Sequence, residues 1–376
     1  MRELTPEPVA SPLRARWPII VASVAAAVLI GACHGPVRPA NAGTVLTQSR
    51  ADGGSHIAQA EGGWLTRKVT FANAGMMIEK VSYRSQGLTI FGQVCRPRGR
   101  GPFPVLVYNH GGFHGLGRYW NGQACKSAAK NGYVTIASSY RGEDGSQGKV
   151  EACLGEVADV LNMIDVAAAF AYTDDDHIVM YGASHGGCIT LRAVAAGAPV
   201  QAATAIAAPV DWAKAYRYIV RQSANKALPQ TARATYRYLA AVVRTAAGGT
   251  PDEVPAAYRA RSPLYEADAL GAWPHPLLIS HGVDDAIVRV SASCRLAAAM
   301  GNVSAYHLDA TGKGVAQHSP PGCDDIDNWR DGPIPAPRWP NPPYLILYDA
   351  AAHTHGKQWL PMLLQGLFFL AQNQPR

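Results

Sequence analysis

Short, continuously apolar runs alternate with helix-like segments along most of the sequence, and this alternation restricts the folds open to the chain. Residues 156–173, for example, carry apolar side chains at the spacing of one helix face. The apolar runs lack polar alternation, which is typical of strands that are covered on both faces. They occupy residues 104–112, 133–142, 177–184, 201–210 and 276–282. The pattern predicts an α/β fold with a mostly parallel central sheet and helices on both faces.

Composition and length fit one large domain of this kind. Of the 376 residues, 48% are apolar and 16% are charged, so the chain can bury a large core. Before the first apolar run, two strand-like stretches flank Gln86-Gly87 and predict an antiparallel hairpin at 76–97. We assign residues 76–376 to one folded domain. The net charge of +7 comes without clustered basic residues, so no nucleic-acid partner is expected.

The N-terminal segment has the features of an export signal. Its uncharged apolar run at 19–32 is shorter than the roughly 20 residues of a transmembrane helix, but suits a secretory signal. The run ends in IGAC, which resembles the lipobox of bacterial lipoproteins. This resemblance implies removal of residues 1–32 and attachment of lipid to Cys33. An ordinary signal peptide or an uncleaved anchor is the alternative. Residues 33–75, rich in Gly, Ala, Ser and polar residues, are expected to form a flexible tether.

A G-x-S-x-G motif lies between the strand-like HIVMYG and a helix-like stretch. In this context the motif indicates a sharp turn that holds Ser184 in strained backbone geometry at the end of the strand. Ser184 is therefore a candidate nucleophile. The backbone N–H of His185, at the start of the helix, is a candidate donor to an oxyanion. A glycine-rich turn with an incidental serine is the alternative, and the His185 side chain is expected to point away from Ser184.

A second glycine-rich turn, HGGFHG, begins at His110 where another apolar run ends. Such a turn supplies a second oxyanion donor near the serine, and we assign this role to the backbone N–H of Gly112. A turn that merely leaves the strand is the alternative. No carboxylate or cysteine lies at a ligand-like spacing from His110 and His114, so we expect no metal site.

A candidate acid follows the apolar run at 276–282. A carboxylate at the C-terminal end of a later strand is where a serine triad needs the group that orients its base. Asp284 and Asp285 both satisfy this condition. The pattern HG-x-x-D-x-x-V favours Asp285.

A candidate base follows the apolar stretch LILYDAAA near the C-terminus. His353 completes the chain order Ser, Asp, His from a loop after a strand, and we favour it. His355 lies in the same loop and stays open as the alternative. His307 and His318 also lie beyond the candidate acid.

Taken in order, these segments resemble the α/β-hydrolases of the prolyl oligopeptidase and dienelactone hydrolase group. The resemblance extends over most of residues 76–376. The segments that carry it are PVLVYNHGG, Tyr140-Arg141-Gly142, GEVAD at 155–159, DDDHIVMYGASHGG, Ser262-Pro263 and HGVDDAIV. It implies an α/β-hydrolase fold in which Ser184, Asp285 and His353 form the catalytic triad.

Three segments differ from the family's pattern or add to it. The 75 residues before the domain are far too few for the β-propeller of prolyl oligopeptidases. Residues at about 211–272 contain two helix-like stretches and predict a small helical cap. A Pro- and Asp-rich insertion at about 311–343 separates the strand-like VSAYHLDA from the run that precedes His353.

The resemblance implies a serine hydrolase that cleaves carboxylic esters through an acyl-enzyme and uses no cofactor. A serine peptidase acting on short peptides or acyl-amino acids is the alternative. A catalytically silent hydrolase fold that binds ligands at the cell envelope is a third possibility. The expected partners are a small ester or short peptide and, through lipid on Cys33, a membrane. Since His34 and not Asp follows that cysteine, the lipoprotein pattern implies the periplasmic face of the outer membrane if the host is Gram-negative. The oligomeric state is left open.

The chain has seven cysteines, an odd number. If Cys33 carries lipid, the remaining six form an even set that permits disulfides in an oxidising compartment. Six cysteines allow 15 full pairings, and the sequence does not choose among them. Our hypothesis is Cys125–Cys153 and Cys294–Cys323, with Cys188 simply buried.

Overall fold

The computed structural model of the protein describes residues 65–73, 76–116, 129, 131–315, 320, 322–326, 329–330 and 343–373. The predicted signal, Cys33 and the first part of the predicted tether lie outside these residues. No helix within the described ranges is long and apolar enough to cross a membrane.

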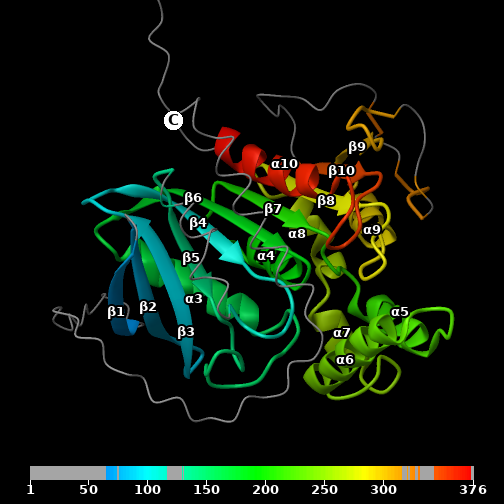
Figure 1. Ribbon diagram of the computed structural model, residues 1–376, viewed down its shortest axis with the longest axis horizontal. Coiled ribbons are helices and arrows are strands. Elements are labelled where there is room, and N and C mark those ends of the chain that lie inside the picture. The colour runs from blue at the N-terminus through cyan, green and yellow to red at the C-terminus, as the bar shows by residue number, and fades with distance from the viewer. Residues whose placement is uncertain are drawn as a thin grey trace, which may run out of the picture.

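One twisted sheet forms the centre of the molecule (Figure 1). Its strands lie in the order β1-β2-β3-β5-β4-β6-β7-β8-β10-β9. β1, β2 and β3 pair in antiparallel fashion and β3 is antiparallel to β5, whereas every pair from β5 to β9 along the sheet is parallel. The strands are β1 (Leu65–Asn73), β2 (Met76–Ser85), β3 (Leu88–Pro97), β4 (Phe103–Asn109), β5 (Val134–Ser138), β6 (Thr173–Ala183), β7 (Ala202–Ile206), β8 (Leu277–Gly282), β9 (Ser304–Leu308) and β10 (Tyr344–Tyr348). The predicted hairpin and the mostly parallel sheet are confirmed.

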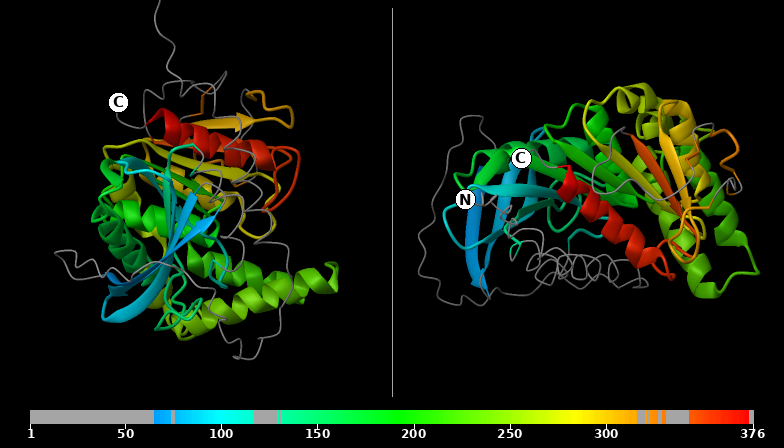
Figure 2. Two further views of the ribbon diagram at one scale, coloured as in Figure 1. Left: turned by 60° about the vertical axis from the view of Figure 1, so that its left-hand side comes forward. Right: turned by 90° about the horizontal axis from the view of Figure 1, so that it is seen from above.

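Helices cover both faces of the sheet, as predicted. Helix α10 (Trp359–Gln372) lies on the opposite face from α3 (Glu156–Ala168), α4 (His185–Ala195) and α9 (Ser291–Met300) (Figure 2). Each face has its own apolar core, and consecutive strand residues contribute to different cores. In β8, Leu278 packs in the core under α10 and Ile279 in the core under the other helices, and both are fully buried. A strand covered on both faces therefore reads as a continuous apolar run.

Two predicted boundaries were wrong. The tether was expected to reach residue 75, but residues 65–73 form β1, which pairs with β2 along its whole length. Within this segment, Lys68-Val69-Thr70-Phe71 alternates polar and apolar residues, which suits a strand. Helix α3 ends at Ala168 and not at residue 173, because β6 already begins at Thr173.

The segment predicted as a cap is helical. It comprises α5 (Trp212–Ala224), α6 (Gln230–Ala247), α7 (Pro255–Ala260), the 3₁₀ turn η2 (Pro263–Glu266) and α8 (Ala267–Gly271). Three of its tyrosines hydrogen-bond loops of the hydrolase body. Tyr218 and Tyr236 both donate to the carbonyl of Ala286, and Tyr238 donates to that of Phe113 at 3.2 Å. These contacts join the helices to the loops that follow β8 and β4.

The last two strands do not follow their chain order in the sheet, and the sequence alone does not predict this. β9 takes the outer edge, and β10 lies between β8 and β9, parallel to both. β10 therefore pairs with β8 as well as with β9, although β9 precedes it in the chain. As a result, the loops that follow β8 and β10 are neighbours.

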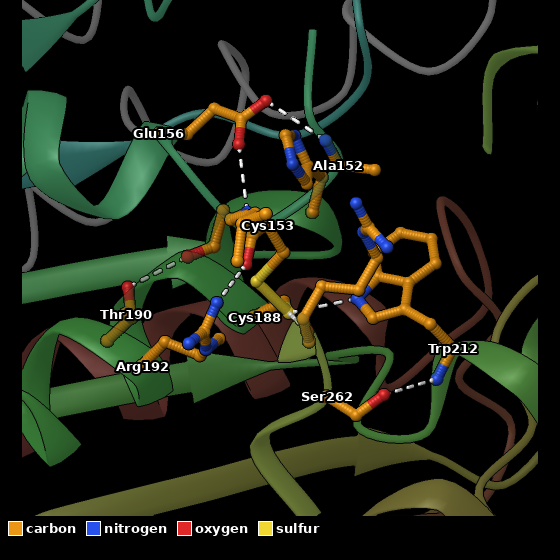
Figure 3. Close-up of a disulfide and its surroundings, with 12 residues drawn as sticks. Ala152, Cys153, Glu156, Cys188, Thr190, Arg192, Trp212 and Ser262 are labelled. Atoms are coloured by element: carbon orange, nitrogen blue, oxygen red, sulfur yellow. Dashed lines mark hydrogen bonds between the residues drawn. A yellow bond between two sulfur atoms is a disulfide. The ribbon is translucent and has the colours of Figure 1, made fainter. Parts of the chain in front are cut away.

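Disulfides join elements that are distant in the sequence. The predicted Cys294–Cys323 bond is confirmed. The predicted Cys125–Cys153 bond is wrong, because Cys153 is bonded to Cys188 (Figure 3). Helices α3 and α4 pack on the same face of the sheet, so the residue three positions before α3 meets the first turn of α4. Cys95 is disulfide-bonded as well.

Removing the Cys153–Cys188 bond is expected to lower the free energy of unfolding by about 3 to 4 kcal/mol. The bond spans 35 residues, and losing it frees a loop of that length in the unfolded chain. The measurement is urea unfolding of a Cys153→Ala/Cys188→Ala variant without reductant. The double variant Cys294→Ala/Cys323→Ala serves for comparison. It removes the other disulfide, which spans 29 residues and does not involve the helix that follows Ser184. Both variants should lose stability, whereas an unchanged first variant contradicts the prediction.

Candidate active site

Ser184 occupies a sharp turn between β6 and α4. Its φ of 55° lies in the left-handed region, which a non-glycine residue adopts only under strain. The turn is held by hydrogen bonds from its N–H to Ile206 O at 2.8 Å and from Cys188 N–H to its carbonyl at 3.1 Å. The flanking glycines are needed for close approach. A Cβ at Gly182 would lie 2.2 Å from the Gly186 carbonyl oxygen, and one at Gly186 would lie 2.0 Å from the Asn109 oxygen.

His353 lies in the loop that follows β10 and contacts Ser184 directly. Its Nε2 is 3.0 Å from Ser184 Oγ. Its own carbonyl accepts a hydrogen bond from Trp359 Nε1 at 3.0 Å, which ties the loop to the start of α10. The alternative, His355, is exposed and reaches back only with its carbonyl, to Ala352 N–H. The structure therefore brings His353, and not His355, to the serine.

Asp285 completes the hydrogen-bonded chain from the loop after β8. Its Oδ2 is 2.7 Å from His353 Nδ1, and its Oδ1 accepts from the N–H groups of Ile287 and Val288 at 2.8 and 2.9 Å. Asp285 is 2% exposed, whereas its neighbour Asp284 is exposed to solvent. The preference for Asp285 over Asp284 thus agrees with the geometry.

The charges of the pair stabilise each other. Burial alone would raise the pKa of Asp285, but the charge of His353 and hydrogen bonds from His281 and His353 hold it well below its ordinary value. Burial alone would lower the pKa of His353, but the charge and hydrogen bond of Asp285 outweigh this effect and raise it. Asp285 is therefore an anion, and His353 is a stronger base than a free histidine.

The loop after β4 lies against the serine turn. A Cβ at Gly111 would come within 3.0 Å of the Ala183 carbonyl oxygen and 3.3 Å of Ser184 Cβ. The next residue, Gly112, has a φ of +77°. Its carbonyl oxygen is 3.0 Å from Nδ1 of His185. The two residues predicted to supply oxyanion donors are thus adjacent to the serine turn and to each other.

The His185 side chain supports this loop. It is 2% exposed and packs on the Phe113 ring at a centroid distance of 4.5 Å. Burial lowers the pKa of His185 to about 4, so the ring is neutral at pH 7. The neutral ring can donate from Nδ1 to the Gly112 carbonyl. The prediction that its side chain points away from Ser184 Oγ agrees with this contact.

Two further supports were missed by the sequence analysis. His281, in β8, is fully buried, and its Nε2 lies 3.4 Å from Asp285 Oδ2 and 2.9 Å from Val288 O. The loop after β4 is held by two acidic side chains. Glu143 accepts a hydrogen bond from the N–H of Gly115, and Asp144 accepts one from the N–H of Leu116. A histidine within the strand LLISHG was visible in the sequence, but nothing there indicated a contact with Asp285.

The remaining histidines beyond Asp285 are placed elsewhere or not described. His307 belongs to β9, and its Nε2 bonds Asp349 Oδ1 at 2.8 Å. His318 lies outside the described residues, as does part of the insertion at 311–343.

Turnover is expected to fall as the pH decreases through the pKa of His353. The imidazole must be neutral to accept a proton, and Asp285 raises its pKa above the ordinary value of 6.5. The acidic limb of kcat/KM should therefore have its midpoint above pH 6.5, measured with a p-nitrophenyl ester from about pH 5 to about pH 9. An Asp285→Asn variant should move that limb to lower pH. A wild-type midpoint below 6.5 would contradict the role given to the pair.

The comparisons with known proteins agree with this geometry. Residues 118–319 match the model of the prolyl oligopeptidase family, and this range is more than half of the chain. The uncharacterized peptidase YtmA of Bacillus subtilis (strain 168) is 26% identical over 214 residues, which cover 57% of this chain and 75% of that protein. The family match includes Ser184 and Asp285 and ends before His353.

Solved structures share the fold at low sequence identity. Acylaminoacyl peptidase from Pyrococcus horikoshii has a TM-score of 0.51 and 18% identity, with 80% of this chain and 40% of that chain covered. Acetyl xylan esterase 1 from Thermoanaerobacterium sp. JW/SL YS485 has a TM-score of 0.51 and 15% identity, with 81% and 87% covered. This chain thus spans less than half the length of that peptidase.

Fold and family together define the class of protein. The mostly parallel sheet, the serine turn and the family match place the chain among the serine hydrolases of the α/β-hydrolase fold. Within that class, the chain belongs to the prolyl oligopeptidase family.

Proposed function

We propose that the protein hydrolyses carboxylic esters through an acyl-enzyme, with Ser184 as nucleophile, His353 as base and Asp285 as the residue that orients the base. The observation that carries this proposal is the continuous chain of hydrogen bonds from Ser184 Oγ through His353 to Asp285. A base within hydrogen-bond reach of the nucleophile, itself oriented by a buried carboxylate, is the arrangement that activates a serine.

The hydrogen-bonded arrangement supports the following order of proton transfers. His353 Nε2 takes the proton from Ser184 Oγ as the oxygen attacks the ester carbonyl, and a tetrahedral intermediate forms. The backbone N–H groups of Gly112 and His185 bind its oxyanion. His353 then gives the proton to the leaving alcohol, and the acyl group stays on Ser184. Water, deprotonated by His353, attacks the acyl-enzyme; as the second tetrahedral intermediate collapses, His353 returns the proton to Ser184 Oγ and the acid is released. These steps use only side chains and amides of this chain.

Neighbouring structures favour an ester, and the family favours a peptide as the second candidate. This chain covers 87% of the acetyl xylan esterase from Thermoanaerobacterium but 40% of the acylaminoacyl peptidase. The family match and the peptidase name of the Bacillus relative support cleavage of short peptides or acyl-amino acids. The same acyl-enzyme chemistry serves both substrates, since only the leaving group differs.

A substrate panel distinguishes the two candidates. Purified protein is assayed with p-nitrophenyl esters of increasing acyl length and with aminoacyl and N-acylaminoacyl anilides. A higher kcat/KM for the esters supports the proposal. A higher kcat/KM for the anilides supports the peptidase activity instead. A fluorophosphonate probe is applied in parallel. A protein that takes neither label nor substrate would fit the silent binding fold instead.

We also propose that the chain is exported and anchored by lipid on Cys33 to the periplasmic face of the outer membrane. The IGAC sequence supports this proposal, and the two described disulfides fit an oxidising compartment. Growth of an expressing Gram-negative host with a labelled fatty acid should label the wild type and not a Cys33→Ser variant. Equal labelling of both would refute the anchor.

A further inference from the structure

A basic cleft of about 490 Å³ lies between the cap and the hydrolase body, apart from the Ser184 site. Its walls come from the residues after β7, from α5, and from the loop after β8 together with the start of α9. Ser184, His353 and Asp285 do not line this cleft. A cleft of this size accommodates a small organic ligand.

Five cationic side chains line the cleft, against one acidic side chain, Asp211. They are Lys214, Arg217, Arg221, Arg289 and Arg295. Arg217 pairs with Asp252 at 2.6 Å, and Arg295 lies 3.5 Å from Asp211. The other three have no acidic partner within 4.0 Å among the described residues. Among the described residues, positive side chains of the cleft therefore outnumber the acidic ones, and Arg289 lies 5.9 Å from the centroid of the Tyr218 ring.

Hydrogen-bond donors lie close to these cationic side chains. Nε of Arg295 is buried and has no hydrogen-bond partner among the described residues. Helix α9 begins in the wall with Ser291 and Ala292, and its N-terminus has neither a side-chain cap nor an acidic residue in the first turn. The N-terminus of a helix favours anions, and guanidinium groups bind phosphate oxygens with paired N–H donors.

We propose that this cleft binds a phosphate-bearing ligand. Three cations without an acidic partner among the described residues and a helix N-terminus without a side-chain cap line one cavity, and a phosphate group can bind both. A multiply charged phosphate suits this excess of charge better than a single carboxylate, because it offers more charge and more acceptor oxygens.

The cleft also shares a loop with the candidate acid. Ile287 and Val288 line its wall, and their N–H groups donate to Asp285 Oδ1. Tyr218, another wall residue, donates to Ala286 O at 2.8 Å. A ligand in the cleft therefore contacts the back of the loop that positions Asp285.

Isothermal titration of the purified full chain at low salt tests the site. Two probes distinguish two sources of phosphate: pyrophosphate represents free phosphorylated compounds, and glycerophosphoglycerol represents the headgroup of an anionic lipid. Glycerol serves as the uncharged control. We expect saturable binding of at least one phosphate probe at one site per chain. The probe that binds more tightly indicates the source.

Paired variants separate the cleft from general surface charge. Lys214→Gln/Arg289→Gln removes two unpaired cations of the cleft and is expected to weaken binding about tenfold or more. Lys226→Gln/Arg237→Gln removes two exposed charges of the cap that do not line the cleft, and should leave binding unchanged. All four side chains are exposed, and thermal unfolding verifies that the variants fold. Absence of binding by both probes, or equal weakening in both double variants, would overturn the proposal.

Discussion

A Ser184→Ala variant is expected to lose ester turnover by a factor of about 10⁴ to 10⁶ while keeping its fold. The oxygen that attacks the substrate is removed, and His353 loses the group whose proton it accepts. Under the proposed mechanism, water can still attack a bound ester while the amides of Gly112 and His185 stabilise its oxyanion. We therefore expect a small residual rate above the uncatalysed reaction. The measurement is kcat for a p-nitrophenyl ester under saturating conditions.

A second serine serves as the control for this variant. Ser223, on helix α5, hydrogen-bonds only the carbonyl of Val220 among the described residues. Ser223→Ala should retain both turnover and labelling by a fluorophosphonate, whereas Ser184→Ala should lose both. Labelling that persists in Ser184→Ala would show that another residue is the nucleophile.

A His353→Ala variant is expected to lose turnover by a factor of similar size, about 10⁴ to 10⁶, because Ser184 then has no base. The neighbouring histidine makes a sharp control. His355 lies two positions away in the same loop, is exposed, and takes no part in the hydrogen-bonded chain. His355→Ala should therefore keep turnover within a few-fold of the wild type. The reverse outcome, with loss only in His355→Ala, would refute the assignment of the base.

Loss of the base should also differ from loss of structure. Urea unfolding should show that His353→Ala still folds but is less stable than His355→Ala, because the change leaves the buried Asp285 carboxylate without the imidazole that pairs with it. The His353→Ala variant also retains Ser184. Prolonged incubation with a fluorophosphonate should therefore label His353→Ala slowly, but not Ser184→Ala.

The sequence was most informative where local chemistry determines local structure. Ser184 could be predicted because its turn requires glycines on both sides, and Gly182 and Gly186 indeed approach other backbone atoms too closely for a Cβ. The continuous apolar runs could be assigned as buried parallel strands because both faces of each strand are covered. These features depend on a few consecutive residues.

Features that depend on distant pairing were less accessible. The apolar pattern of β9 and β10 indicates two strands. It does not indicate that β10 lies between β8 and β9 in the sheet. The Cys153–Cys188 bond depends on how α3 and α4 pack, which the spacing of cysteines does not encode. His281 supports Asp285 across the turn after β8, and a single buried histidine in a strand carries no signal of that role.

The position of β10 has a consequence for how the hydrolase matures. The serine turn is built from β6 and α4 in the middle of the chain, whereas the base arrives only with the last strand, which must settle between β8 and β9. A chain still lacking its final residues has its nucleophile but no partner to activate it. If Ser184 and His353 act as proposed, the chain gains hydrolytic activity only once β10 has paired with β8 and β9.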